Sequence, residues 1–361
     1  MSWRMPAETD PHERLWMAWP SGGYTLGDTQ ESAHEARAAW AAVANAARQF
    51  EPVTMAVRPE DRAIAEAYLD PRVDLLETAL DDAWMRDIGP SFVLGTSGEA
   101  APAGAPRLGA VDWVFNGWGA QDWASWEDDA GVARTVSEAA GAVRVPSALV
   151  NEGGGIQVDG LGTVLLTETV QLDPGRNPGA TKAGVEAELA RTIGARHAVW
   201  LPRGLTRDSQ RFGTRGHVDL VAAIPRPGTL LVHVQHSPEH PDHEVTGEIL
   251  EALRSSRTAE GKRWEVIELP APAQLHDGED WVDWSYINHT AVNGGLIACS
   301  FNDPQDEKAL RILADAYRGR RVIAVDSRAI FSRGGGIHCI TQQQPRALSA
   351  VRTPAPALGR S

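Results

Sequence analysis

The stretch RGHVDLVAAI, residues 215–224, places polar residues directly before a short apolar run, and this form recurs along the chain. Four more segments share it: WMRDIGPSFVL (84–94), NEGGGIQV (151–158), SYINHTAV (285–292) and GGGIHCIT (334–341). With Asp87, Glu152, His217, Asn288 and Cys339 as markers, the intervals are 65, 65, 71 and 51 residues. Short strands that begin with a polar residue are common everywhere, but five at near-regular spacing indicate an internal repeat.

Helices and strands are expected between these segments. Periodic apolar residues predict helices over residues 32–50, 61–69, 129–140, 181–193, 243–254 and 305–317. Short apolar, β-branched runs predict strands over residues 53–57, 73–78, 163–168, 197–202, 217–224, 229–234, 264–269, 295–300 and 321–325. Single helices separated by two or three strands differ from the strict alternation of a doubly wound sheet. A ring of ββαβ units would point all five markers toward one axis.

Composition and charge narrow the classes of function. The chain has 361 residues, 42% hydrophobic and 23% charged, which is typical of a globular protein of one large or two ordinary domains. The formal charge of −14 disfavours nucleic acid and anionic membranes as partners, and it suits a cationic ligand. No apolar run approaches the roughly 18 residues that would span a bilayer.

Further features of the chain favour a cytoplasmic protein with one domain. The N-terminus lacks the apolar region of a secretory signal, and two cysteines exclude a disulfide scaffold. The Gly/Ala/Pro-rich segment 95–108 predicts a mobile surface hairpin, and residues 346–361 a frayed tail. With no other boundary evident, we expect one domain over residues 1–361. The sequence leaves a homo-oligomer open.

Cys339 is the first candidate for chemistry. It follows three glycines, which allow backbone to approach a ligand closely, and a thiol there could react as thiolate beside a base or a positive charge. An isolated cysteine is more often buried and inert. Cys299 fits that description better, because it lies within an apolar strand.

His217 and Asp219 form an H-x-D pair. On a strand, residues two apart face the same side, so a histidine and a carboxylate would share one pocket, as an acid/base group beside a substrate clamp does. Two solvated polar residues on a half-exposed strand are the alternative.

Acidic and aromatic residues are interleaved in DDAWMRDIGPSF. Asp81, Asp82 and Asp87 around Trp84 resemble a cation site, although an acidic turn would look the same. Trp113, Trp118, Trp123 and Trp126 lie within fourteen residues. Core packing explains most of them, and one or two, Trp118 among them, would line a pocket.

Other patterns give little. His236, His240 and His243 could suggest a metal, but two prolines disrupt their spacing and no cysteine assists, so a solvated loop is expected and no metal site. The glycine runs lack the spacing of a phosphate-binding loop, and G-x-S-x-G, C-x-x-C and H-E-x-x-H are absent.

The motifs together resemble the agmatine deiminases, which are guanidino-modifying penteins close to bacterial peptidylarginine deiminases. The resemblance runs from about Met5 to Pro345. The motifs that carry it are MPAETDPHERLWMAWP (5–20), DDAWMRDIGPSFV (81–93), NEGGGIQVDG (151–160), WLPRGL (200–205), GHVD (216–219), SYIN with the later NGG (285–295) and GGGIHCITQQQP (334–345). It implies a five-bladed α/β propeller, which agrees with the repeat.

The resemblance also implies roles for individual residues. Cys339 matches the nucleophile, His217 the acid/base group and Glu152 the carboxylate that orients it. The remaining matches are Asp87 and Asp219 for the pair that grips the guanidinium, Asn288 for a polar pocket residue and Trp84 for a ring beside the substrate. The implied reaction passes through a covalent thiouronium intermediate, with no metal or organic cofactor.

The chain departs from the pattern in three places. The loop 206–215 is longer than usual and holds Arg207, Arg211 and Arg215, Thr9-Asp10 replaces a common Trp-Glu, and Gln157 replaces a frequent His. The substrate tail therefore stays open among agmatine, free arginine, peptidyl arginine and other guanidino compounds. An amidinotransferase and a catalytically silent binding module are more remote alternatives.

Overall fold

Four of the main sheets repeat one order of elements: a strand, an antiparallel partner, a helix, and a third strand parallel to the second. The computed structural model describes residues 2–95 and 107–347. The four units are β5 (Ser91–Gly95), β6 (Leu108–Val114), α6 (Val132–Ala139) and β7 (Val143–Val150); β8 (Gln157–Val158), β9 (Thr163–Thr167), α8 (Lys182–Ile193) and β10 (His197–Leu201); β11 (Ala222–Arg226), β12 (Thr229–Val234), α9 (Asp242–Ser255) and β13 (Glu265–Pro270); and β16 (Thr290–Val292), β17 (Gly295–Ser300), α10 (Asp306–Ala316) and β18 (Arg321–Asp326). The helix is required because two parallel strands need a long crossover between them.

The fifth unit joins the two ends of the chain. Strand β19 (Thr341–Pro345) pairs antiparallel with β2 (His12–Ala18), which leads through α2 (Gln30–Ala47) to the parallel strand β3 (Val53–Val57). Helix α3 (Arg62–Tyr68) and β4 (Asp74–Glu77) extend this sheet, and β1 (Trp3–Arg4) extends the β5 sheet. The shorter elements are α1 (Gly23–Leu26), α4 (Met85–Ile88), α5 (Gly117–Ala120), α7 (Glu168–Gln171), α11 (Arg328–Phe331), β14 (His276–Asp277) and β15 (Asp280–Trp281).

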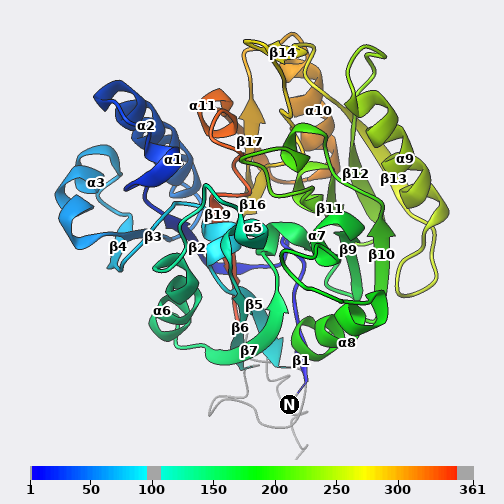
Figure 1. The fold of residues 1–361 in the computed structure, drawn as a ribbon, viewed down its shortest axis with the longest axis horizontal. Helices are drawn as coiled ribbons and strands as arrows, with labels where there is room; N and C mark the ends of the chain where they lie inside the picture. Colours follow the sequence, from blue (N-terminus) through cyan, green and yellow to red (C-terminus); the bar gives the residue numbers. More distant parts are fainter. Residues whose placement is uncertain (1, 96–106, 348–361) are drawn as a thin grey trace, which may run out of the picture.

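Figure 1 shows the five sheets arranged around one centre, with the long helices α2, α6, α8, α9 and α10 on the outside. The ββαβ repeat expected from the sequence is therefore confirmed, and so is the α/β fold class. Each unit begins with a short strand that is preceded by one of the five marker segments.

Local sequence accounts for where the longer helices begin and end. The Thr29 side chain accepts a hydrogen bond from the Ser32 N–H at the start of α2, and Thr181 does the same for Gly184 in α8. Each bond satisfies one of the free N–H groups at a helix start. Helix α8 ends at Gly194, whose φ of 72° is the left-handed conformation that glycine adopts most readily.

Tryptophan fills much of the interior, as the composition suggested. Trp16, Trp19 and Trp40 are among the largest fully buried side chains. The Trp16 indole N–H donates to Gln344 Oε1 at 2.9 Å, which ties β2 to β19. Buried side chains of all five main sheets form one continuous cluster that includes Cys339, so the candidate nucleophile is placed by the core.

Most of the expected elements are confirmed within two or three residues, and one is wrong. Residues 217–224 do not form a continuous strand, because residues 218–220 form a short 3₁₀ turn and β11 begins only at Ala222. The hairpin expected over 95–108 and the frayed tail expected over 346–361 lie largely outside the described residues. In the described part of the chain, no helix is long and apolar enough to cross a membrane.

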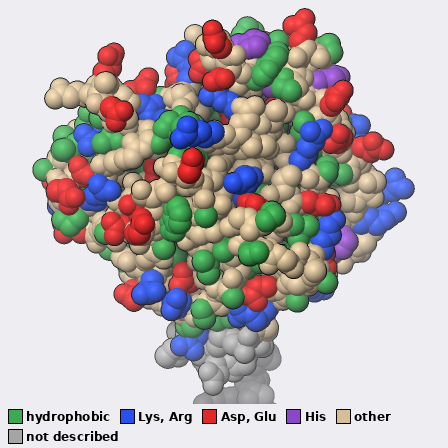
Figure 2. Space-filling model, in the orientation of Figure 1, with side chains coloured by type: hydrophobic (Ala, Val, Ile, Leu, Met, Phe, Trp, Pro, Cys, Tyr) green, Lys and Arg blue, Asp and Glu red, His purple; other side chains and the backbone are tan. Residues whose placement is uncertain are grey.

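Acidic and basic side chains are interspersed on the face shown in Figure 2, without an extended region of either sign. Many are paired, for example Arg203 with Glu248 at 3.0 Å and Arg311 with Glu307 at 3.0 Å. Exposed pairs of this kind contribute little to stability.

Candidate active site

The five marker residues all precede the first strand of a unit. Asp87 lies in α4 before β5, Glu152 before the turn 153–155 that leads to β8, and His217 before the turn 218–220 that leads to β11. Asn288 and Cys339 occupy the turns before β16 and β19. All five are at least 96% buried. The repeat thus brings one polar side chain from each unit into the interior, and Asp219 adds a sixth.

His217 lies between two carboxylates. Its Nε2 is 3.2 Å from Glu152 Oε2, and its Nδ1 is 3.9 Å from Asp87 Oδ1 and has no hydrogen-bond partner among the described residues. Burial acts to lower the pKa of His217, but the negative charges of Asp87 and Glu152 outweigh it and raise this pKa to about 9. His217 is therefore protonated at neutral pH.

Arg176 holds Glu152 in place, and the sequence analysis missed it. The Arg176 Nε lies 3.0 and 3.1 Å from the two Glu152 carboxylate oxygens, and its other nitrogens donate to Asp173 Oδ2 and to the Thr214 carbonyl. Although burial raises the pKa of Glu152, Arg176 and His217 lower it to about 2. Arg176 stands in no recognisable motif, so only the folded chain reveals it.

Asp87 and Asp219 flank the same space with different hydrogen bonds. Asp87 accepts from the Trp118 indole N–H at 2.9 Å and from the Gly154 N–H at 3.2 Å. Burial raises the pKa of Asp87 to about 6, with Glu152 and Asp219 adding to the effect. Asp219 Oδ2 is 2.7 Å from His338 Nδ1, while its buried Oδ1 has no partner among the described residues. Burial would raise the pKa of Asp219, but His338 lowers it.

The Cys339 thiol is held by an amide and faces a carboxylate. Its Sγ lies 3.3 Å from Asn288 Nδ2 and 3.7 Å from Asp219 Oδ2. Asn288 Oδ1 accepts from the backbone N–H groups of His338 and Cys339, which fixes the amide. Burial, Asp219 and Asp87 raise the pKa of the Cys339 thiol, so the free site holds a thiol.

Gly154 leaves open the space where these groups converge. A Cβ at this position would lie 2.5 Å from His217 Nδ1 and 3.0 Å from both Asp87 Oδ1 and Asp219 Oδ2. A histidine and two carboxylates therefore face one point, which only a residue without a side chain keeps clear. Planar groups with several N–H donors suit such a site.

Aromatic side chains close the space next to Cys339. Trp84, Trp118, Trp123 and Phe212 line a cavity of about 10 Å³ beside Asp87 and Cys339. This is room for roughly one water molecule, so a substrate can enter only if part of the lining moves. Trp118 and Trp123 stack at 5.3 Å, and Phe212 stacks on Tyr24 at 4.3 Å.

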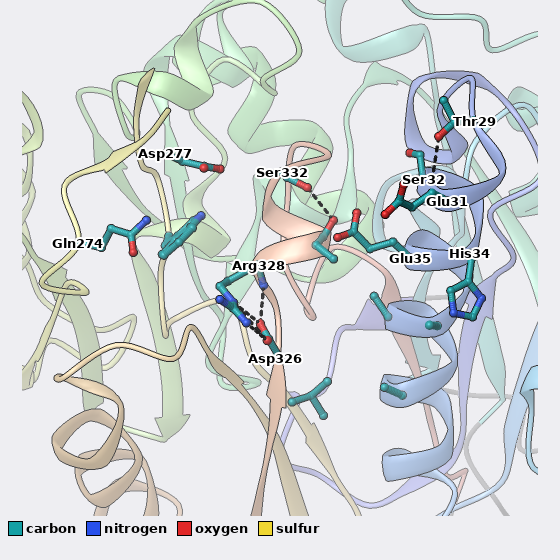
Figure 3. A pocket seen from close by; sticks show the side chains of 16 residues that line it. Thr29, Glu31, Ser32, His34, Glu35, Gln274, Asp277, Asp326, Arg328 and Ser332 are labelled. Atoms are coloured by element: carbon teal, nitrogen blue, oxygen red, sulfur yellow. Dashed lines mark hydrogen bonds and ion pairs between the residues drawn. The ribbon is translucent and has the colours of Figure 1, made fainter. Parts of the chain in front are cut away.

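A wide groove elsewhere lacks this chemistry. It measures about 1080 Å³ and lies between α2, α11 and the end of β18, where Figure 3 shows Glu35 of α2 and an ion pair between Asp326 and Arg328. None of the marker residues lines it, and it contains no cysteine.

The structure corrects several sequence interpretations. His217 and Asp219 do face one space, but they do so across a 3₁₀ turn and not along a strand. Of the three aspartates near Trp84, only Asp87 reaches the site. Asp81 and Asp82 instead accept hydrogen bonds from nearby backbone, and their own N–H groups donate to Asp129.

The histidine-rich segment is only partly the solvated loop that we expected. His240 is buried and its Nε2 lies 3.0 Å from the Val282 carbonyl. Within residues 2–95 and 107–347, no group of three or more His, Cys, Asp and Glu side chains has a metal-binding arrangement.

A ring of ββαβ units around a buried cysteine, histidine and carboxylates defines the class of protein: the guanidino-modifying penteins. The chain belongs to the Porphyromonas-type peptidyl-arginine deiminase family, whose model matches residues 4–345.

Several known proteins are similar to this chain over nearly its whole length. A curated protein of Streptomyces coelicolor is 57% identical over 96% of this chain and 100% of its own length. The agmatine deiminase of Stutzerimonas stutzeri is 38% identical over 94% of this chain and 95% of its own. The solved agmatine deiminase of Enterococcus faecalis superposes with a TM-score of 0.87 and 29% identity, covering 96% of this chain and 97% of that one.

Proposed function

We propose that this chain hydrolyses the guanidino group of agmatine to give N-carbamoylputrescine and ammonia. The observation that carries the proposal is the convergence of His217, Asp87 and Asp219 on the point left clear by Gly154, with the Cys339 thiol 3.7 Å from Asp219. Relatives that are 37–38% identical to this chain are agmatine deiminases, which supports agmatine as the substrate.

Substrate binding follows from the charges. Two carboxylates accept hydrogen bonds from the planar fork of a guanidinium, and the unpartnered Oδ1 of Asp219 gains a donor. The bound cation also offsets the carboxylate charges that raise the pKa of Cys339, so thiolate forms more readily once substrate is present. Neutral ligands lack this effect.

Bond changes then proceed in two halves. Once the substrate is bound, the Cys339 thiol releases its proton to solvent, and the thiolate attacks the guanidinium carbon to form a C–S bond. His217 donates its proton to the leaving nitrogen as the C–N bond breaks, so ammonia departs and a cationic thiouronium remains. The neutral His217 next takes a proton from water, whose oxygen attacks the same carbon. The hydroxyl proton of the resulting intermediate passes to the Cys339 sulfur as the C–S bond breaks. This step releases the ureido product and restores the Cys339 thiol and the protonated His217.

Glu152 and Arg176 support this proton transfer. The pKa of Glu152 is lowered to about 2, so this carboxylate is ionised at neutral pH. Because it lies 3.2 Å from His217, it fixes the imidazole and stabilises its charged form. Removal of the negative charge would make His217 a stronger acid but a poorer base for the second half of the reaction.

Ammonia release from four substrates tests the proposal: agmatine, arginine, a blocked arginine peptide and 4-guanidinobutyrate. We expect turnover of agmatine well above the others and none with Cys339→Ser. The absence of ammonia release from agmatine would contradict the proposed function.

A second candidate is a guanidino substrate that bears a carboxylate. Arg207 and Arg211 line a cavity next to the one at Cys339, and their guanidinium groups are the cations that a substrate carboxylate would pair with. Arginine and 4-guanidinobutyrate in the panel test this alternative directly.

We also propose one catalytic domain over residues 1–361 that acts in the cytoplasm on a small cationic substrate. The pairing of the last strand, β19, with β2 near the start of the described chain supports a single domain. Two buried free cysteines and the charge of −14 support the location and the substrate class.

A further inference from the structure

A second cavity lies directly beyond the lining of the Cys339 cavity. It measures about 190 Å³, and it shares Phe212, Gly213 and Gly334 with the smaller cavity. A Cβ on Gly334 would lie 2.9 Å from the Phe212 carbonyl oxygen, so these two residues form the boundary between the cavities. None of the residues in the proposed reaction lines the second cavity.

Asp283 is the unusual side chain of this second cavity. It is only 6% exposed, and its Oδ1 has no hydrogen-bond partner among residues 2–95 and 107–347. Burial, reinforced by Asp208 and Asp242 and opposed by Arg207, raises the pKa of Asp283 to about 7. A buried carboxylate without a partner is costly, and a ligand cation would remove that cost.

Aromatic rings complete a site that suits an ammonium group. Tyr24, Phe212 and Phe331 line the cavity with Asp283, and aromatic rings beside a carboxylate are typical of sites for organic cations.

Arg207 lies near enough to Asp283 to lower its pKa, but neither arginine of the cavity donates a hydrogen bond to the Asp283 Oδ1. Arg207 donates to the Trp281 carbonyl at 3.1 Å, and the Arg211 guanidinium lies 4.9 Å from the centre of the Phe212 ring. Asp283 is the more deeply buried group, so its demand for a partner outweighs that of the two arginines, which keep access to solvent.

We propose that Asp283 binds the primary ammonium group at the far end of the substrate, while Asp87 and Asp219 hold its guanidinium. The proposal rests on the proposed function and adds the group that selects the tail. The four-carbon chain would cross between Phe212 and Gly334, which requires the 206–215 loop to shift from its present contacts.

Steady-state kinetics on agmatine and n-butylguanidine tests this role, because the two differ only by the terminal ammonium. We expect Asp283→Asn to lower kcat/KM for agmatine by at least about tenfold. The loss should appear mainly in KM, because the contact between Asp283 and the substrate ammonium is the same in the bound substrate and in the transition state. Turnover of n-butylguanidine should stay within about twofold of wild type. Glu279→Gln, an exposed neighbouring acid, should change neither substrate.

The outcomes separate the two proposals. Equal losses on both substrates, or an unchanged KM for agmatine, would overturn the role of Asp283 alone. Equal turnover of both guanidines by the wild-type protein would also overturn this role, and that measurement does not depend on the folding of a variant. If the wild type releases ammonia from neither guanidine, the proposed function and this inference fall together.

Discussion

Nδ1 of His338 lies 2.7 Å from Oδ2 of Asp219, and the next residue after His338 is Cys339. The other ring nitrogen, Nε2, is 3.0 Å from Glu8 Oε2. Burial and Arg86 act to lower the pKa of His338, but Glu8 and Asp219 raise it overall. His338 thus contacts both carboxylates, and its raised pKa favours the charged imidazole, which in turn favours the ionised form of Asp219.

His338→Leu is expected to lower kcat/KM for agmatine by about 10- to 100-fold, since a hydrogen bond to a charged group contributes about 1.5–3 kcal/mol. The pKa of Asp219 would rise without this donor, so the acid limb of the pH–rate profile should move to higher pH. His338→Asn can still donate near the Nδ1 position and should retain more activity. Equal losses in the two variants with unshifted pH profiles would contradict the role of His338.

The markers before each strand could be predicted from sequence because they repeat, and a repeat of one structural unit implies a common axis. Arg176, Glu8 and His338 could not. Arg176 is 24 residues from Glu152, and Glu8 is 330 residues from His338. Such partners are brought together only by the closed ring of sheets. The error at 217–224 has a local cause, since the apolar pattern of a strand continued through a 3₁₀ turn.

The two cysteines should respond differently to the same substitution. Cys339→Ser is expected to fold normally and lose almost all turnover, because a hydroxyl is a far weaker nucleophile than a thiolate at neutral pH. Cys299→Ser should keep most activity. Cys299 is buried in β17, its Sγ donates to the Asn288 carbonyl at 3.1 Å, and burial raises its pKa to about 11.

Ammonia release and circular dichroism on both cysteine variants measure this difference. Comparable losses in the two would remove Cys339 from the nucleophile position.

Gly154→Ala should lower turnover by about 100-fold or more while the protein stays folded. The added methyl would lie 2.5 Å from His217 Nδ1, within the space where His217, Asp87 and Asp219 converge. Neighbouring groups must move to relieve this contact, and a misplacement of about 1 Å costs about 100-fold in rate. Gly247→Ala in α9 is the control, because a Cβ there meets nothing within 4 Å. A Gly154→Ala variant with near-normal kcat/KM would show that substrate binds elsewhere.

The pH dependence of kcat/KM should be bell-shaped. Below about pH 6, Asp87 becomes protonated and loses its attraction for the guanidinium, because its pKa is raised to about 6. Above about pH 9, His217 loses the proton that the leaving nitrogen needs, because its pKa is raised to about 9. Activity should therefore be highest between these values.

Initial rates measured across this range test the bell-shaped pH profile. Samples returned to neutral pH show whether any loss of activity comes from irreversible unfolding. A profile that keeps rising beyond pH 10 would contradict the assignment of His217 as the acid.

Agmatine should exceed arginine in kcat/KM by at least about 100-fold, or roughly 2.7 kcal/mol, the scale expected for desolvating an unpaired carboxylate. The two substrates differ only by the α-carboxylate of arginine, which would enter a cavity that already holds the buried, unpartnered Asp283. Like charges would repel there. Steady-state rates at one pH measure the ratio, and Arg207→Gln serves as the matched variant, since it removes the cation that would favour a carboxylate. Equal values for the two substrates, or an arginine preference that Arg207→Gln abolishes, would mean that the loop arginines select the tail and that Asp283 does not.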